Sequence, residues 1–481
     1  MLPSLLYLKG KGGKTIPPHV FDDLQLTQLL KRDAITVSSA VCGPDDILAR
    51  HDVFRSLEAP DVRSHFVALH RSVTTLSRLD AQLASAKCES ERNAIFVTLM
   101  HEYRDFMRRA SKSVGSGTFC SNFSSYFANE CDTQRFASLS EAVDRLFPAM
   151  TEMQYNVLKI DGEKYRLAPG KMPTYIEALK KRTEELGIEP PQLPAAPPRS
   201  LSPAIIGATA RLYPSLFAQF AQFREQFAHQ YDRSVLAYRA ELGFYLALCK
   251  LFDRVREAGI PLTYPRLAKK RVYRVRDAYD ITLLAKNVTN IIPNDIDFTP
   301  EEPFFYLTGA NGGGKTTYLR AVGVSAVFLL WGCPMPCHAA EVHPPSCLFT
   351  HFPRDERFES KGRSFDEVDR VNEILAAADG NSMALFNETY SATSEDKAVS
   401  MTQELAQKLY DSKIFGLYIT HQHGLADHGV PFLNVVIDRE DNNRRTFKVE
   451  RRRAVSGSFA RDVLKKYGLT REALEERFPK K

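Results

Sequence analysis

A glycine-rich stretch in the C-terminal half holds residues whose types and spacing fit phosphate binding. Residues 309–316 read Gly-Ala-Asn-Gly-Gly-Gly-Lys-Thr, which matches G-x-x-x-x-G-K-[ST] at every fixed position. The glycines let the backbone turn, so that successive N–H groups and a helix N-terminus can face phosphate oxygens. Lys315 would contact the β- and γ-phosphates, and the Thr316 hydroxyl would ligate Mg²⁺. The stretch therefore predicts a site for a nucleoside triphosphate.

Two later apolar runs end in polar residues that could complete this chemistry. Ser382–Phe386 has the pattern of a buried strand and is followed by Asn387 and Glu388. In a phosphate-hydrolysing site Glu388 could orient or deprotonate the attacking water. Asn387 places a neutral amide where an aspartate would help to hold Mg²⁺, so slow hydrolysis is expected. His421 follows another strand-like run and could sense the γ-phosphate from the same sheet edge.

The segments around these residues alternate between strand and helix patterns. An apolar run leads into Gly309, and residues 319–330 have the pattern of a helix. Such alternation implies a mainly parallel sheet with helices on both faces, that is, an α/β P-loop NTPase domain. We place this domain at residues 266–481.

Upstream of the predicted ATPase domain the pattern is helical. Residues 17–57 and 60–147 have helical periodicity, and Asp45 and Asp46 suit the cap and first turn of one helix. Apolar residues recur three and four apart at Phe66, Leu69, Val73, Leu76 and Leu79. We therefore predict an all-α core and lever region over residues 1–147.

A small β element and a connector are expected to interrupt the helices at residues 148–203. Residues 153–160 and 163–168 alternate around Asp161-Gly162, a strong hairpin signal. A short helical stretch at 175–186 precedes a proline-rich segment, which predicts an extended connector. Residues 204–265 are then expected to hold a long lever helix. The apolar spacing continues from Pro214 to Gly259, or roughly 65 Å of helix.

Composition narrows the class of protein. A chain of 481 residues with 44% hydrophobic and 25% charged residues predicts two to four soluble domains. The net charge of +6 is mild, so a nucleic-acid surface would need clustered Lys and Arg. No run is long and apolar enough for a membrane helix, which favours a cytoplasmic protein. The eight scattered cysteines are expected to be reduced. The segment CPMPCHAAEVH (333–343) departs from the usual zinc-ligand spacings.

Three segments together resemble the nucleotide-binding domain of the MutS family of DNA mismatch-repair ATPases. They are GANGGGKTTYLRAV, SMALFNETYSATSEDKA and YITHQHGLAD, in that order. IIPNDIDF, GRSFDEVDRVNEIL and SGSFARDVLKKYGL also match the family's pattern. The resemblance is strong over residues 275–481 and looser over residues 17–270.

The resemblance implies roles for individual residues. Asn294 would lie near the adenine, Glu388 would be the catalytic carboxylate, and His421 the sensor. Ser364 and Glu367 would face the nucleotide of a partner subunit, and residues 391–396 would cross the dimer interface. The triphosphate would be held by Gly309, Ala310, Asn311, Gly312, Gly313, Gly314, Lys315, Thr316 and Thr317. Catalysis would use Glu388, His421 and Lys315, with Thr316 and Asn387 at the metal.

The expected function is a MutS-like homodimer that joins through its ATPase domains and clamps nucleic acid, DNA rather than RNA. The resemblance implies a truncated member, because no room precedes residue 17 for mismatch-reading and connector domains. ATP binding and slow hydrolysis would control clamp closure. The basic runs at 266–276 and 442–453 are either phosphate contacts or solvated faces. Two alternatives stay open: an ATPase acting on structured RNA or ribosomes, and a non-hydrolysing, ATP-gated structural dimer.

Overall fold

The computed structural model describes most of the chain. The described residues are 2–9, 13–31, 35, 39–113, 115–153, 155–161, 164–169, 181–185, 187, 203–288, 290–353, 363–390, 395–422, 425, 429–438, 444–451 and 477. The chain divides into two compact units, each drawn from separate stretches. The first comprises residues 1–3, 60–115 and 120–242, and the second comprises residues 4–59, 116–119 and 243–481. The functional division into lever, clamp and ATPase regions stays a prediction.

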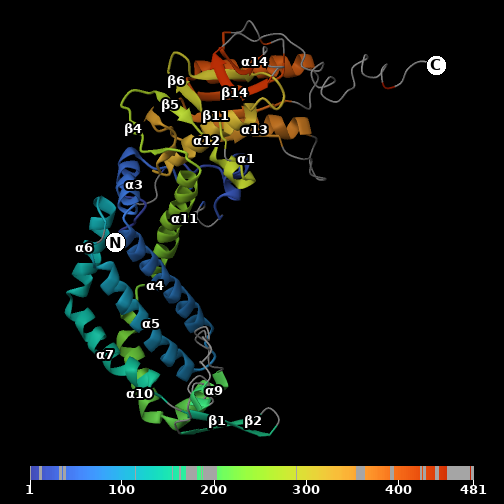
Figure 1. The fold of residues 1–481 in the computed structure, drawn as a ribbon. Helices are drawn as coiled ribbons and strands as arrows, with labels where there is room; N and C mark the ends of the chain where they lie inside the picture. The colour runs from blue at the N-terminus through green and yellow to red at the C-terminus, as the bar shows by residue number, and fades with distance from the viewer. Residues whose placement is uncertain are drawn as a thin grey trace. The chain divides into compact units, whose positions relative to one another are not determined.

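The first unit is mainly helical. Its helices are α4 (Pro60–Ser85), α5 (Glu89–Ala110), α6 (Thr118–Cys131), α7 (Gln134–Thr151), α9 (Pro203–Leu212) and α10 (Pro214–Phe227). Helix α5 packs against α4, α7 and α10 (Figure 1). The apolar positions predicted for α4, from Phe66 to Leu79, are buried. Helical periodicity therefore identified the packed face of this helix.

The hairpin predicted in this unit is confirmed. Strands β1 (Tyr155–Asp161) and β2 (Lys164–Pro169) pair antiparallel. Residues 181–185 are helical, as part of the predicted helix at 175–186. The rest of that helix and the proline-rich connector lie outside the described residues.

The single long helix predicted over residues 214–259 is wrong. Helix α10 ends at Phe227, and α11 (Tyr238–Glu257) begins after the 3₁₀ turns η2 (Ala228–Gln230) and η3 (Arg233–Ala237). Tyr231 and Asp232 between the turns are extended. The Asp232 carboxylate accepts hydrogen bonds from the N–H and hydroxyl of Ser234, at 2.9 and 2.6 Å. This local cap competes with the helical pairing of the backbone and starts a new turn.

The second unit is built on a six-stranded sheet with the order β10-β11-β12-β7-β13-β14. Its strands are β7 (Phe304–Thr308), β10 (Leu348–His351), β11 (Met383–Asn387), β12 (Phe415–Ile419), β13 (Phe432–Asp438) and β14 (Arg444–Arg451). The first five strands in the order run parallel, and β14 runs antiparallel to β13. The predicted mainly parallel sheet is confirmed.

Helices cover both faces of this sheet (Figure 1). Ala384 and Phe386 of β11 belong to a buried cluster that includes apolar residues of α13 (Arg363–Ala377) and α14 (Glu395–Asp411). Leu385, which lies between them, points to the opposite face, where a Cβ on Gly323 of α12 (Lys315–Leu330) would lie 3.0 Å from it. Alternate residues of one strand thus contact helices on opposite faces, which explains why the strand is apolar throughout.

The second unit also contains smaller sheets beside the six-stranded one. A four-stranded sheet has the order β4-β9-β5-β6, and β3 pairs with β8. These strands are β3 (Leu262–Thr263), β4 (Arg266–Leu267), β5 (Tyr273–Ala278), β6 (Asn294–Phe298), β8 (Met335–Pro336) and β9 (Ala339–Val342). The 3₁₀ turn η4 (Ile281–Lys286) lies between β5 and β6. Asp280 caps η4 and pairs with the buried Arg320 of α12 at 3.0 Å, which ties the turn to that helix.

The N-terminal residues of the second unit form short helices rather than one continuous helical run. They are α1 (Pro18–Asp23), the 3₁₀ turn η1 (Leu26–Gln28) and α3 (Pro44–Ser56), with a β-bridge between Thr15 and Ala40. Asp45 and Asp46 lie in the first turn of α3 as predicted, whereas the cap position belongs to Gly43. Pro44 at the first helical position explains that start.

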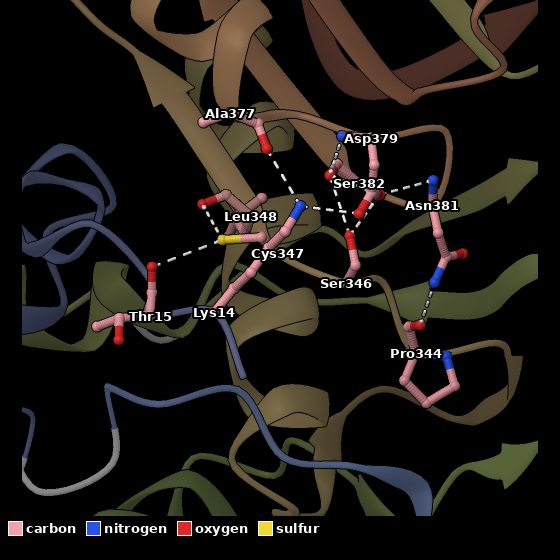
Figure 2. Close-up of polar contacts among 10 residues, drawn as sticks. All are labelled: Lys14, Thr15, Pro344, Ser346, Cys347, Leu348, Ala377, Asp379, Asn381 and Ser382. Carbon is pink, nitrogen blue, oxygen red and sulfur yellow. Dashed lines mark hydrogen bonds and ion pairs between the residues drawn. The ribbon is translucent and has the colours of Figure 1, made fainter. Parts of the chain in front are cut away.

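A polar network anchors the start of this segment (Figure 2). The Lys14 ammonium donates to the Ala377 carbonyl at the end of α13, at 3.1 Å, and pairs with Asp379 at 2.8 Å. Asp379 also accepts from the hydroxyl of Ser346 at 2.6 Å and from the backbone N–H of Asn381 at 2.9 Å. A cation at a helix C-terminus is favourable, so Lys14 stabilises both the helix end and the following turn.

Two further features bear on the expectations from composition. Within the described ranges, no helix is long and apolar enough to cross a membrane. All eight cysteines are described, and each is a free thiol. Cys333 and Cys337 of the CPMPCHAAEVH segment are buried, and burial raises the pKa of both thiols.

Candidate functional site

The glycine-rich loop connects β7 to α12 at the carboxyl edge of the sheet. Gly309, Gly312 and Gly314 have φ values of +128°, +67° and +101°, which side chains rarely adopt. A Cβ on Gly309 would lie 2.9 Å from Asn434 Oδ1 and 3.1 Å from the backbone nitrogen of Val435. Strand β13 therefore packs directly against the loop. The loop turns where only glycine fits, as the sequence predicted.

Lys315 is the first residue of α12, and its side chain folds back over the loop. It is buried, and its ammonium donates to the carbonyls of Gly309 and Ala310 at 2.9 and 3.3 Å. Burial lowers the pKa of Lys315 to about 8, Glu388 raises it, and Arg445 lowers it. A phosphate would supply the anionic partner that these neutral carbonyls lack.

Glu388 and His421 follow two neighbouring parallel strands, and their side chains meet. Asn387 is in register with Ile419, and His421 Nε2 lies 2.9 Å from Glu388 Oε1. The hydrogen bond from His421 lowers the pKa of Glu388, against the opposite effect of burial. Glu388 is therefore held as a carboxylate. The prediction that both residues share one sheet edge is confirmed, whereas their catalytic roles stay predictions.

The turn that carries Glu388 is backbone-strained and held by buried hydrogen bonds. Glu388 and Tyr390 have φ values of +50° and +66°. The Tyr418 hydroxyl donates to the Thr389 carbonyl at 2.6 Å, and the Thr389 hydroxyl lies 2.9 Å from His351 Nδ1. Several buried hydrogen bonds on one turn can keep unfavourable backbone angles in place. These supporting residues were not foreseen from the sequence, where a Thr, a Tyr and a His in apolar strands give no signal.

Asn387 and Thr316 are the two residues predicted to face Mg²⁺. Asn387 Oδ1 is buried, and no hydrogen-bond partner for it lies among the described residues. An orphaned amide oxygen is a hard acceptor of the kind that Mg²⁺ uses. Thr316 is the second residue of α12 and is partly buried. The residues present therefore fit a divalent cation.

Asn294, which the resemblance places near the adenine, makes two hydrogen bonds to β14. It is buried, and its amide donates to the Phe447 carbonyl at 3.0 Å and accepts from the Val449 N–H at 2.8 Å. Both polar groups of the side chain are thus used to hold β14 against β6. A position near adenine stays a prediction for Asn294.

The structure places the remaining predicted residues as follows. The backbone of Ser364 lies in the first turn of α13, and Glu367 of the same helix is buried. Asp396 lies in the first turn of α14, while residues 391–394 of the predicted dimer loop lie outside the described residues. Thr317 accepts from Arg320 within α12 at 3.5 Å, and Asn311 is exposed.

Two residues of β14 border the loop and were missed by the sequence reading. A Cβ on Gly312 would overlap Nη1 of Arg445, and a Cβ on Gly314 would lie 3.2 Å from the Phe447 ring. The sequence shows a basic run at this point but not which of its residues reaches the loop. The register of β14 against β13, which has an irregularity between Val435 and Ile437, decides that.

Three of the six cations in the other basic run, residues 266–276, pair with carboxylates. Arg274 pairs with Asp297 at 3.4 Å, and Arg276 pairs with Asp295 at 2.9 Å. Arg266 pairs with Glu341. These pairs favour the reading of residues 266–276 as a solvated face of β4 and β5.

Comparison with known proteins identifies the family to which this site belongs. Residues 305–473 match the family model described as MutS domain V. Over these residues the chain is similar to a MutS domain V. This MutS domain V contains the glycine-rich loop, Asn387, Glu388 and His421 within its matched range.

The similarity extends to individual DNA mismatch repair proteins named MutS. The chain is 30% identical over 159 residues to the protein of Caldanaerobacter subterraneus subsp. tengcongensis, which covers 31% of this chain and 18% of that protein. It is 30% identical over 148 residues to the protein of Natronomonas pharaonis, covering 30% of this chain and 17% of that protein. A longer match is to the MutS protein of Caldicellulosiruptor saccharolyticus, 23% identical over 289 residues. It covers 58% of this chain and 33% of that protein. The matched segment thus spans less than a fifth of the first two relatives.

Proposed function

We propose that this MutS-family chain binds ATP at its glycine-rich loop and hydrolyses it slowly. The observation that carries the proposal is the contact between Glu388 and His421, 2.9 Å apart at the ends of adjacent strands. The electrostatic influence of Glu388 on Lys315 links that pair to the glycine-rich loop. A loop that cradles phosphate, a buried lysine and an oriented carboxylate are together what water attack on a γ-phosphate needs.

Glu388 would act as the base or orienting acceptor for the attacking water. Its lowered pKa keeps it ionised at neutral pH, so it can accept a proton from the water as the oxygen attacks. His421 would orient the carboxylate by their hydrogen bond and would report whether a γ-phosphate is present. Lys315 would leave the loop carbonyls and pair with the phosphate chain.

Thr316 and Asn387 would hold Mg²⁺ together with phosphate oxygens and water. When bound, the ion supplies positive charge that neutralises the phosphate oxygens. Asn387 offers an acceptor oxygen but no negative charge, so the chain would bind the ion through a weaker set of ligands than a carboxylate would give. This difference is the physical reason for proposing slow hydrolysis.

The whole molecule would work as a homodimer on DNA. Family membership supports this role, because the relatives in the comparisons are named as DNA mismatch repair proteins. ATP bound at the ATPase domains would favour a closed dimer, and hydrolysis would release it. The clamp would hold DNA through phosphate contacts, so its affinity would fall with rising salt.

Steady-state and single-turnover hydrolysis test the proposal. Glu388→Gln should lower turnover by about 100-fold or more, since it removes the base, while ATP binding changes by less than about threefold. Lys315→Ala should abolish tight ATP binding. Glu257→Gln, which changes an exposed carboxylate at the end of α11, is the matched control and should behave as the parent. Parent-like hydrolysis by Glu388→Gln would remove this carboxylate from the mechanism.

A further inference from the structure

Arg445 of β14 lies over the middle of the glycine-rich loop. A Cβ added to Gly312 would overlap Arg445 Nη1 and would lie 3.3 Å from Cζ and 3.8 Å from Nη2. Three atoms of the guanidinium therefore lie within contact distance of a side chain placed at residue 312. Gly312 combines this crowding with a φ of +67°, so the loop leaves room for the guanidinium only because the residue is glycine.

Arg445 differs from other cations of β14 in its contacts. In the part of the chain that the structure describes, no hydrogen bond or ion pair involves Arg445, which is exposed. Its neighbours on the strand differ: Lys448 donates to the Pro293 carbonyl at 2.6 Å, and Arg451 pairs with Glu302. Lys448 and Arg451 are thus bonded to other groups of the protein, whereas Arg445 lies over the loop.

Arg445 also adds to an excess of positive charge around the loop. Lys315, whose ammonium folds back over the loop carbonyls, is a second cation at the loop. Glu388, a carboxylate that acts electrostatically on Lys315, is already hydrogen-bonded to His421. Two neighbouring cations repel each other unless an anion lies between them, and a polyphosphate is the anion that the loop is shaped to take.

We propose that Arg445 is a phosphate-binding residue of the ATP site, supplied by the same chain that supplies the loop. This inference rests on the proposed ATP-binding function and extends it to a residue outside the P-loop motif. The planar guanidinium can give two parallel N–H groups to phosphate oxygens, which a lysine cannot. Gly312 and Arg445 are then a matched pair, in which the small residue admits the large cation.

The test is equilibrium binding of ADP and of a non-hydrolysable ATP analogue, each with Mg²⁺, to the full chain. Arg445→Gln should weaken both ligands by about tenfold, the usual loss for a hydrogen bond to a charged group. Arg445→Lys should recover only part of the affinity, because the charge returns without the two-pronged geometry. The salt dependence of binding should also become shallower in Arg445→Gln.

Lys448→Gln is the matched control, because it removes one positive charge from the same strand. The Lys448 ammonium is bonded to the Pro293 carbonyl. This variant should bind both ligands within about twofold of the parent, and thermal unfolding without nucleotide should show that each variant is folded. If Arg445→Gln binds like the parent while Lys315→Ala loses binding, the assignment of Arg445 is wrong and ATP binding at the loop stands. If Lys315→Ala also binds like the parent, the proposed function itself fails.

Discussion

Asn387 is the residue that we propose sets how strongly the site holds a divalent cation. Its Oδ1 atom is buried with no partner among the described residues, although a buried amide oxygen normally finds a donor. The strand that carries it is parallel to β12, so its position at the sheet edge is fixed by the ladder rather than by its own side chain. An aspartate at this position would keep the shape and add one negative charge.

Asn387→Asp should therefore tighten Mg²⁺ binding in the presence of ATP, on the order of tenfold, because ligand charge sets the affinity for hard cations. Turnover should rise with it. A Mg²⁺ titration of ATP hydrolysis measures both effects. Asn129→Asp, on an exposed position of α6, adds the same charge elsewhere and should leave the titration unchanged. An unaltered Mg²⁺ midpoint in Asn387→Asp would show that this side chain does not face the metal.

At this scale the sequence was informative where a motif or a strand end marks the residue. Lys315 belongs to a fixed spacing, and Glu388 and His421 each follow an apolar run, so their shared edge could be predicted. Arg445 could not be selected from the basic run, because its contact with Gly312 depends on the register of β14. The use of Asn294 to hold β14 likewise depends on a pairing between residues far apart in the chain.

Among the elements, α10 and α11 show that apolar periodicity detects buried positions but does not detect a break between two helices. Val235 of the connecting turn is buried, so the apolar spacing continues through the break. The break itself is made by Asp232, whose carboxylate caps the backbone two residues ahead. The sequence prediction relied on the spacing of apolar residues and gave no weight to a single capping aspartate. For that reason it predicted one long helix.

The turn after α13 shows how another element is anchored. Burial alone would raise the pKa of Asp379, but hydrogen bonds from Lys14, Ser346, Asn381 and Ser382 hold it well below its usual range. A carboxylate with a lowered pKa in the folded state stabilises the fold above its unfolded pKa of about 3.9 and loses that contribution as the pH falls. The network therefore binds the N-terminal segment to α13 most firmly at neutral pH.

Asp379→Asn should lower the free energy of unfolding at pH 7 by about 1 kcal/mol, a modest value because the side chain is half exposed. The difference from the parent should shrink as the pH falls below about 4, because the unfolded parent then binds a proton at Asp379 while the folded parent still holds the carboxylate ionised. Denaturant unfolding of both proteins at pH 7 and below about pH 4 measures this difference in the free energy of unfolding. Lys14→Met and the double variant complete a cycle that isolates the ion pair. A loss of stability that is equal at both pH values would contradict the electrostatic explanation.

At the scale of the whole molecule, the ATPase site and the oligomeric state are expected to depend on each other. A dimer that closes on ATP must bind ATP more tightly when dimeric, and by reciprocity ATP must tighten the dimer. In the proposed dimer this coupling is a free energy that can be measured. The variant that binds ATP without hydrolysing it is the natural tool for measuring it.

Glu388→Gln with ATP and Mg²⁺ should dimerise roughly tenfold more tightly than with ADP, a coupling of ordinary size. Sedimentation velocity over a range of protein concentrations measures the two dissociation constants. Lys315→Ala should give the same value with either nucleotide, because it should not hold them. Equal dimer affinities with ATP and ADP in Glu388→Gln would separate nucleotide binding from assembly.

The contacts of Lys14 also have a consequence for the order in which the chain becomes structured during its synthesis. Its partner carbonyl on Ala377 lies 363 residues further along the chain. At about 5–20 residues per second, a ribosome needs roughly 20–70 s to reach that residue. Throughout that interval α1 and α3 have emerged but lack the strands and helix that bury them in the finished unit. The second unit therefore cannot be completed until its later strands have been translated, and its N-terminal apolar residues are exposed to chaperones until then.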